Sequence, residues 1–288
     1  MRIAETVKEV KDIVKQWKAE GLTVGFVPTM GYLHRGHESL MKLAGENDRV
    51  VVSIFVNPIQ FGPGEDFDSY PRDFENDCRI CEENDVDLVF HPAGSEMYEK
   101  DYTTFVDMTG PTEELCGLSR PGHFRGVCTV VNKLFHIVNP DRAYFGQKDA
   151  QQLAVIRRMV RDLNMDTEII GAPIIREEDG LAMSSRNKNL SREERRAAVI
   201  LSKAVTLGEG LMKAGERDTL CLLERMKSCI NTEPLARTDY IKIVDAASME
   251  PVEKADRPVL AAMAVFIGKT RLIDNFIFDS TDVIKERL

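Results

Sequence analysis

The chain of 288 residues can hold one large domain or two modest ones with a sizeable core. Its 43% hydrophobic and 30% charged residues are ordinary for a globular protein. The net charge of −9 argues against a dedicated nucleic-acid surface. Residues 1–8 lack the apolar core of a signal peptide, and no apolar run is long enough to span a bilayer. We therefore expect a soluble cytoplasmic protein with reduced cysteines.

The first 176 residues alternate helical patterns with short apolar runs. These runs lack polar alternation, which is typical of parallel strands covered on both faces. The predicted strands are residues 23–27, 49–57, 87–90, 142–145 and 167–172, with 103–108 as a further candidate. The predicted helices are residues 3–19, 36–43, 72–84, 127–138 and a segment from 149 onward. This order predicts an α/β fold, a Rossmann-like parallel sheet with helices on both faces that binds ligands at the carboxyl ends of its strands.

The composition changes after residue 176. The predicted elements there are helices at 192–213 and 217–230 and strands at 240–244, 258–267 and 271–278. Helices followed by antiparallel strands predict a smaller α+β domain. We therefore predict domains at residues 1–176 and 177–288, with a boundary near 177–187. We expect the smaller domain to act as a lid over bound nucleotide.

Residues 27–37 join the second predicted element, a buried strand, to the start of a helix. Pro28 and Gly31 end the strand, and the helix opens after His34. Free backbone N–H groups and the positive end of the helix dipole suit this geometry to a phosphate. His34 and His37 add donors that can give a proton near neutral pH. A helix-capping turn with incidental histidines is the alternative.

Two later polar segments have similar chemistry. Residues 146–149 follow a strand and precede a helix, so Lys148 can neutralise a phosphate and Asp149 can cap the helix or bind a ribose hydroxyl. Residues 176–187 carry two adjacent serines and an arginine, which suit a phosphate clamp. A solvated turn and an interdomain linker are the respective alternatives.

Cys78 and Cys81 have the spacing of a zinc or redox pair. They lie in a predicted helix, and no second pair follows at zinc-finger spacing. Two small residues on the packed face of a helix are the better interpretation.

Six separated motifs occur in one order along nearly the whole chain. They are Pro28-Thr29-Met30-Gly31 with His34-x-Gly36-His37, Asn57-Pro58-x-Gln60-Phe61-Gly62, Tyr70-Pro71-Arg72, His123-Phe124-x-Gly126, Phe145-Gly146-x-Lys148-Asp149-x-Gln151-Gln152, and Gly180-Leu181-Ala182-Met183-Ser184-Ser185-Arg186-Asn187. With these motifs the chain resembles the pantothenate synthetases (pantoate–β-alanine ligases), a family of the HIGH-motif nucleotidylyltransferase superfamily. Gln147 and Ala150 depart from the family, which more often has Glu and an aromatic residue there.

The resemblance implies ATP-dependent condensation of (R)-pantoate with β-alanine through a pantoyl-adenylate, with release of AMP and pyrophosphate. Mg²⁺ would bridge the outer phosphates of ATP, and no metal site made by the protein is implied. The resemblance also implies a homodimer that acts on small molecules, without nucleic acid or membrane.

Roles for individual residues follow from the same resemblance. His37, His34 and Lys148 would be catalytic, with His37 the better proton donor. The implied ATP-binding residues are Met30, Gly31, His34, Gly36, His37, Gly146, Gln147, Lys148, Asp149, Ile175, Met183, Ser184, Ser185 and Arg186. Gln60 and Gln152 would hydrogen-bond pantoate, and Met30 and Phe61 would line an apolar pocket for its dimethyl centre.

Two other classes of function remain open. A nucleotidylyltransferase with a phosphorylated acceptor would use the same first turn, but the Gln60 and Gln152 pair suits a neutral hydroxy acid better than a second phosphate. A nucleotide-binding protein without activity would leave the histidines, Lys148 and Arg186 without a task. An ATP–pyrophosphate exchange assay distinguishes these alternatives.

Overall fold

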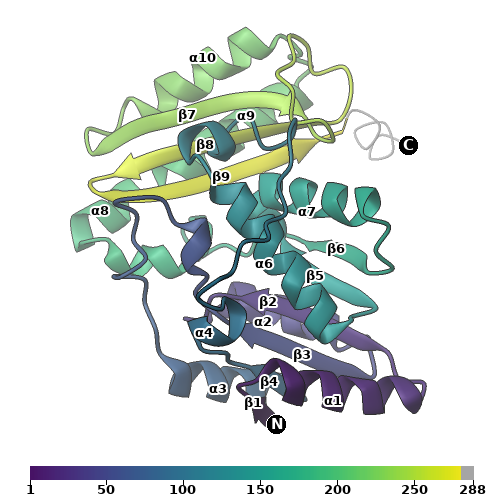
Figure 1. Ribbon diagram of the computed structural model, residues 1–288. Coiled ribbons are helices and arrows are strands. Elements are labelled where there is room, and N and C mark those ends of the chain that lie inside the picture. Colours follow the sequence, from purple (N-terminus) through teal and green to yellow (C-terminus); the bar gives the residue numbers. More distant parts are fainter. Residues whose placement is uncertain (280–288) are drawn as a thin grey trace. The chain divides into compact units, whose positions relative to one another are not determined.

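The computed structural model describes residues 1–279 (Figure 1). The chain divides into two compact units. The first contains Met1–Met108, Arg120–Gln147 and Val155–Ile175. The second contains Thr109–Ser119, Lys148–Ala154 and the described chain from Arg176 onward. Two short segments that precede residue 176 therefore join the second unit, and the predicted domain boundary between residues 176 and 177 stays a prediction.

The first unit is built on a six-stranded sheet in the order β1-β4-β3-β2-β5-β6, in which every neighbouring pair is parallel. Its strands are β1 (Arg2–Ala4), β2 (Val24–Thr29), β3 (Arg49–Ile54), β4 (Leu88–Phe90), β5 (Arg142–Gly146) and β6 (Glu168–Ala172). The chain runs outward from β2 through β3 to β4 and then returns to the other side of β2 as β5. A parallel sheet binds ligands where this order reverses, outside the carboxyl ends of its strands. In this unit that place follows Thr29 and Gly146.

Helices pack against both faces of this sheet, as the sequence predicts. The helices of this part of the chain are α1 (Val7–Ala19), α2 (Arg35–Ala44), α3 (Phe74–Glu83), α4 (Gly94–Met97), α6 (His123–Val138) and α7 (Ala150–Asp162), whose first turn belongs to the second unit. Val52 of β3 belongs to an apolar cluster with Leu40 of α2 and Cys81 of α3. Phe26 of β2 meets Phe135 of α6, with ring centroids 6.4 Å apart. Because successive strand residues point to opposite faces, these contacts fill a core on each side.

The structure corrects the predicted N-terminal helix. Helix α1 begins at Val7, because Thr6 and Glu9 form a capping box that ends the preceding segment. Arg2–Ala4 is instead the edge strand β1, paired with β4.

Three further boundaries differ from prediction. Residues 103–108 form no strand; the backbone N–H of Val106 donates to the Thr129 hydroxyl of α6, 3.0 Å away. Helix α6 begins at His123, four residues earlier than predicted. The helix predicted over 192–213 is two helices, α8 (Arg192–Ala197) and α9 (Ile200–Lys213).

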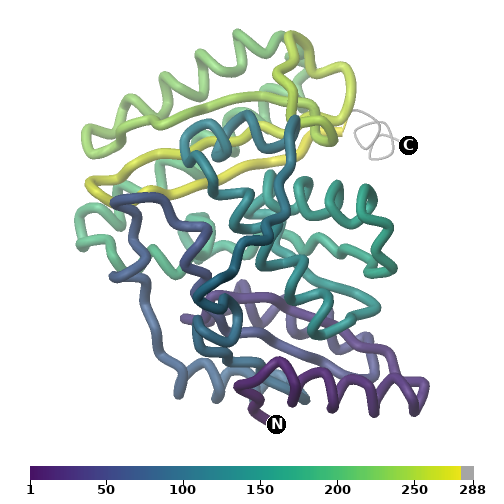
Figure 2. The backbone as a smooth tube through the Cα atoms, viewed as in Figure 1, coloured from purple at the N-terminus to yellow at the C-terminus, as the bar shows by residue number. Residues whose placement is uncertain are grey.

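The second unit contains a three-stranded antiparallel sheet in the order β7-β8-β9, which Figure 2 shows as three long neighbouring segments near the C-terminal end of the colour scale. Its strands are β7 (Ala236–Asp245), β8 (Val259–Ile267) and β9 (Thr270–Phe278), and its helices are α5 (Cys116–Ser119), α8, α9 and α10 (Thr219–Ile230). Residues of α9, α10 and the sheet form one buried apolar cluster. A second cluster joins Leu115 and Ala150 to Val244 and Leu260, which explains why segments 109–119 and 148–154 belong to this unit. Ala150, one of the two departures from the family, therefore has a packing role.

Candidate active site

The turn after β2 is shaped by backbone geometry and by buried polar groups. Gly31 has φ +79°, and a Cβ there would lie 2.9 Å from Asp77 Oδ2. The Thr29 hydroxyl accepts from the N–H of Gly31 at 3.1 Å and donates to the Ser53 carbonyl at 2.8 Å. The turn is therefore tied both to its own strand and to neighbouring β3.

Asp77 of α3 holds the same turn from the other side. Its carboxylate accepts from the N–H groups of Tyr32 at 2.8 Å and Leu33 at 2.7 Å, and the side chain is 1% exposed. Burial raises the pKa of Asp77, and the two N–H donors only partly offset this. Asp77 is not among the residues that the sequence motifs predict for the site. The sequence does contain a sign of its role: Asp77 lies four residues before Cys81, so an acidic side chain falls on the buried face of the helix.

His34 and His37 reciprocally cap the start of α2. His34 Nδ1 accepts from the N–H of Gly36 at 3.1 Å, and His37 Nδ1 accepts from the N–H of His34 at 3.2 Å. The ring centroids are 4.1 Å apart. An accepting Nδ1 leaves the proton of a neutral imidazole on Nε2. The cap thus gives both rings an Nε2–H donor at the positive end of the helix dipole.

Gln60 ends a 3₁₀ turn (Pro58–Gln60) that follows β3. Its Oε1 accepts from Asn57 Nδ2 at 2.9 Å, which fixes the orientation of the amide. Its Nε2 lies 3.3 Å from the sulfur of Met30, a weak acceptor that leaves donor capacity for a ligand. The structure thus brings Gln60 beside the turn that carries His34 and His37. Phe61, predicted to line the pocket, has its ring centroid 5.4 Å from that of Phe67.

The second unit carries the predicted residues Lys148, Asp149 and Gln152. The Lys148 ammonium lies 3.6 Å from Asp149 Oδ2. The Lys148 carbonyl accepts from Asn275 Nδ2 of β9 at 2.8 Å. Gln152 is half-buried, whereas its neighbour Gln151 is buried.

Gln151 organises the segment 109–119 around the start of α7. Its Nε2 donates to the carbonyls of Pro111 at 2.9 Å and Glu114 at 2.7 Å, and its Oε1 accepts from the N–H of Cys116 at 2.9 Å. Both donors of this amide and one acceptor site of its oxygen are therefore used inside the protein. Gln151 is thus a structural residue next to the predicted ligand residue Gln152.

The segment from Arg176 to Asn187 is a folded loop within the second unit. Arg176 makes a two-pronged ion pair with buried Asp274 at 2.8 and 2.9 Å and also donates to the Gly180 carbonyl at 2.9 Å. Asn187 Nδ2 donates to Glu177 Oε1 at 2.8 Å. These contacts make an unstructured linker a poor description of this segment.

The predicted clamp residues lie at the end of this loop. The Ser184 hydroxyl accepts from the N–H of Arg186 at 3.3 Å and caps a short 3₁₀ helix (Ser185–Asn189). Ser185 is buried, while Met183, Ser184 and Arg186 are half-buried. Of the remaining predicted residues, Gly146, Gln147 and Ile175 are half-buried in the first unit. That the residues of both units act on one nucleotide stays a prediction.

The cysteine pair lies on α3, where Cys81 is buried and Cys78 half-buried. Burial raises the pKa of Cys81 to about 12, so its thiol stays protonated at neutral pH. Among residues 1–279, no group of three or more His, Cys, Asp or Glu side chains is arranged to hold a metal ion. No helix of the described chain is long and apolar enough to cross a membrane.

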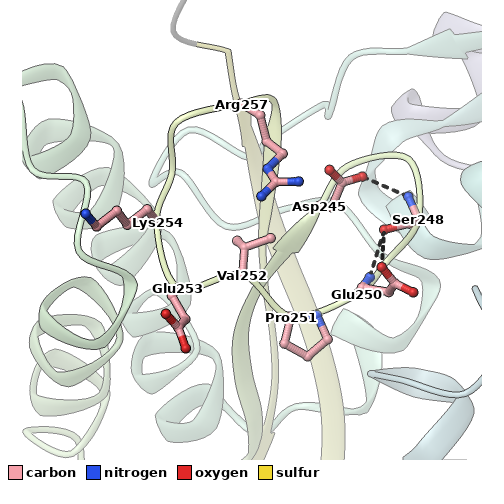
Figure 3. Close-up of a pocket in the computed structure, with 8 residues that line it drawn as sticks. All are labelled: Asp245, Ser248, Glu250, Pro251, Val252, Glu253, Lys254 and Arg257. Atoms are coloured by element: carbon pink, nitrogen blue, oxygen red, sulfur yellow. Dashed lines mark hydrogen bonds between the residues drawn. The ribbon is translucent and has the colours of Figure 1, made fainter.

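A cavity of about 380 Å³ lies elsewhere in the second unit, along the loop that follows β7 (Figure 3). It is lined by Asp245, Ser248, Glu250, Pro251, Val252, Glu253, Lys254 and Arg257. Asp245 accepts from the N–H of Ser248 at 2.9 Å, and Ser248 in turn accepts from the N–H of Glu250 at 3.3 Å. None of the lining residues is a predicted ligand residue.

Comparison with known proteins decides the family. A family model described as Pantoate-beta-alanine ligase matches residues 2–277. The chain belongs to this family. It is 63% identical to the pantothenate synthetase of Ruminiclostridium cellulolyticum over 278 residues, 96% of this chain and 99% of that protein. It is 59% identical to that of Enterococcus faecalis, over 97% and 99% of the two chains.

Solved structures of the family have the same architecture. The pantothenate synthetase of Thermus thermophilus superposes with a TM-score of 0.91 at 45% identity, over 96% of this chain and 99% of that one. The pantoate-beta-alanine ligase of Francisella tularensis, described as complexed with beta-gamma ATP and beta-alanine, superposes with a TM-score of 0.81 at 37% identity, over 96% and 97% of the chains. The predicted Rossmann-like sheet with a smaller α+β part is thus confirmed.

Proposed function

We infer that this chain catalyses the ATP-dependent condensation of (R)-pantoate with β-alanine to pantothenate, through a pantoyl-adenylate and with release of AMP and pyrophosphate. Membership of the pantoate-beta-alanine ligase family supports this reaction. The structural observation that carries the inference is the pair of hydrogen bonds that His34 Nδ1 and His37 Nδ1 accept at the start of α2, which place the proton of each neutral ring on Nε2.

The first step is displacement at the α-phosphorus of ATP by the pantoate carboxylate. The nucleophile is already ionised, so the step needs alignment and charge stabilisation more than a strong base. Negative charge moves toward the leaving pyrophosphate. Donors at a helix N-terminus stabilise that charge without having to reorganise.

We assign the catalytic role in the first unit to His34 and His37. Their Nδ1 atoms accept backbone N–H bonds, which hold the orientation of each ring. The Nε2–H of each ring would then donate to a phosphate oxygen. With Nδ1 accepting, His37 is a neutral imidazole, so we assign it a hydrogen bond to the phosphate rather than transfer of a proton. Met30, Gly31 and Gly36 would border the phosphates by their place in this turn. The N–H groups of Gly31 and Gly36 already donate to the Thr29 hydroxyl and to His34 Nδ1, so the two rings would supply the donors.

We assign the second unit's polar segments to the nucleotide as well. Lys148 would neutralise the α-phosphate region and Asp149 would bind the ribose. Ser184, Ser185 and Arg186 would bind the triphosphate, since two hydroxyls and a planar guanidinium match phosphate oxygens. In the first unit, Gly146 would join Asp149 at the ribose, Gln147 would border the ATP, and Ile175 would join Met183 against the adenine.

Mg²⁺ would enter with ATP rather than at a site made by the protein. The side chains assigned to catalysis are imidazole and ammonium groups, whereas Mg²⁺ prefers oxygen ligands. Phosphate oxygens therefore suit the ion better than these side chains do. When bound, the ion would neutralise charge on the outer phosphates.

We assign Gln60 and Gln152 to pantoate, because amides can both donate to and accept from a hydroxy acid. In the second step the amine of β-alanine attacks the activated carbonyl, and exclusion of water protects the adenylate from hydrolysis. A cytoplasmic location and a homodimer are further proposals that follow from the family resemblance.

The test is ATP–pyrophosphate exchange with a panel of carboxylic acids. We expect exchange with pantoate and little with acids that lack its hydroxyls or dimethyl centre. Pantothenate should form only when β-alanine is added. A stable dinucleotide-type product would favour a nucleotidylyltransferase, and absent exchange would favour a binding protein.

A further inference from the structure

The backbone of Gln60 is held by the first turn of α6, which begins 63 residues later in the chain. His123 Nδ1 lies 2.9 Å from the Gln60 carbonyl, and His123 is 9% exposed. Gly126 allows this approach, because a Cβ there would lie 2.4 Å from the Ile59 carbonyl oxygen and 2.5 Å from Gln60 Cα. The helix therefore packs directly on the backbone that orients the Gln60 amide.

The neighbour of His123 decides which ring nitrogen carries the proton. Arg120 Nη1 lies 3.0 Å from His123 Nε2. A guanidinium only donates, so Nε2 must accept, and the proton of the neutral ring is on Nδ1. Nδ1–H then donates to the Gln60 carbonyl.

Arg120 is itself oriented by Glu65. Two hydrogen bonds, Nε to Oε1 at 2.7 Å and Nη2 to Oε2 at 2.6 Å, form a two-pronged ion pair. Glu65 Oε2 also accepts from the N–H of Gly62 at 3.1 Å. Glu65 and the Gln60 carbonyl, at the two ends of segment 60–65, are thus linked by a chain of hydrogen bonds through Arg120 and His123.

We propose that Glu65, Arg120 and His123 form a relay that positions Gln60 for pantoate, with His123 as the positioning residue. This inference rests on the proposed role of Gln60 in binding pantoate. The relay fixes the peptide of Gln60, while Asn57 fixes its side-chain amide. Together they keep Nε2 beside Met30 rather than free to rotate. Losing the relay should therefore raise KM for pantoate and leave KM for ATP unchanged.

The test compares substitutions of His123 that differ in which ring nitrogen they replace. In His123→Asn the amide nitrogen takes the place of Nδ1 and can still donate to Gln60. In His123→Gln the amide takes the place of Nε2 and leaves that carbonyl without its donor. We expect the Gln variant to raise KM for pantoate roughly tenfold or more, the scale for an unsatisfied buried group. The Asn variant should stay within about threefold of wild type, and KM for ATP should change little in both.

The pair of variants also separates positioning from stability. Both are polar and of similar size, so a merely structural role would lower their melting temperatures and kcat together. Equal KM values for pantoate in the two variants, or an equal rise in KM for ATP, would overturn the relay. Arg120→Lys should raise KM for pantoate by an intermediate amount, because an ammonium cannot make the two-pronged contact with the Glu65 carboxylate.

Gln60→Ala distinguishes failure of the relay from failure of the proposed function. If Gln60→Ala leaves KM for pantoate unchanged, the assignment of Gln60 is wrong and the relay loses its purpose. If Gln60→Ala raises it strongly while His123→Gln does not, the assignment of Gln60 stands and the relay is wrong.

Discussion

The backbone of Gln60 in the first unit and the segment 148–152 in the second are held by contacts of different chemistry. In the first unit Gln60 is fixed by an ionic chain, in which Glu65 orients Arg120 and Arg120 orients His123. In the second unit the segment 148–152 is fixed by the neutral amides of Asn275 and Gln151. Charged contacts depend on pH and salt, whereas amide contacts do not. The two regions should therefore respond differently to the same perturbations.

The largest expected effect is on the chemical step, and it comes from the first unit. His37→Ala should slow adenylate formation roughly 10²-fold or more, the scale for removing a preorganised donor. The melting temperature should change little, because the lost cap contributes only about 1 kcal/mol. Single-turnover adenylate formation measures this.

His136 of α6 offers a matched control, since it is exposed and far along the helix from His123. His136→Ala should form adenylate at the wild-type rate. Near-normal rates in His37→Ala and His34→Ala would instead reduce the two histidines to a helix cap.

The next largest effect is expected from the hydrogen bond between the Asn275 amide and the Lys148 carbonyl, which we call the neutral anchor of Lys148. Asn275→Leu leaves the Lys148 carbonyl without its amide donor, so the lysine turn should shift. We expect KM for ATP to rise roughly tenfold, the scale for an unsatisfied buried group, with KM for pantoate less affected. Ile277 lies on the same strand and is exposed, and Ile277→Thr should change neither constant. If both variants behave alike, the anchor has no functional role.

A pair of adjacent glutamines sharpens the same comparison. Gln151→Met should lower stability by about 2–3 kcal/mol, because it strips partners from the backbone groups of Pro111, Glu114 and Cys116. Gln152→Met should leave the melting temperature nearly unchanged and raise KM for pantoate. Thermal unfolding and steady-state kinetics on both variants measure this. A shared pattern in the two would contradict the division between structural and ligand-binding residues.

The parts of the site that the sequence predicts are local. His34, His37 and Gln60 follow strands directly, and a strand that ends in a turn and a helix can be recognised in a single window. The family motifs carry the rest of the proposed ligand residues, including Lys148 and Arg186. The confirmed sheet follows from the same local patterns.

The missed residues act across long sequence separations. Asp77 binds backbone 45 residues earlier, and Asn275 binds backbone 127 residues earlier. A short stretch of sequence cannot show contacts between residues so far apart. The tautomer of His123 likewise depends on Arg120, which is oriented by Glu65. The start of α1 at Val7 could have been predicted from the sequence, because Thr6 followed by Glu9 has the pattern of a capping box. The predicted strand at 103–108 is wrong: the edges of the sheet are β1 and β6, and the N–H of Val106 donates to the Thr129 side chain instead of to a strand.

The smallest expected effect concerns the pH dependence of the ionic anchor. Burial acts to raise the pKa of Glu65, but the hydrogen bonds and charge of Arg120 outweigh it and hold that pKa below its ordinary value. The folded protein then binds this proton less readily than the unfolded chain does. The contribution to stability is complete above the unfolded pKa of about 4.5 and is lost as pH falls through the lower folded pKa.

Glu65→Gln should remove this contribution. Wild type should be more stable than the variant at pH 7, by no more than about 1 kcal/mol because the pair is partly exposed. The difference should shrink as pH falls below about 4.5, where protonation releases the ion pair in wild type. Thermal unfolding from about pH 7 to about pH 3.5 measures it, with Asn275→Leu as the neutral counterpart whose stability difference from wild type should not vary with pH. A Glu65→Gln difference that grew toward low pH would mean that burial dominates at Glu65 and that Arg120 does not hold the carboxylate charged.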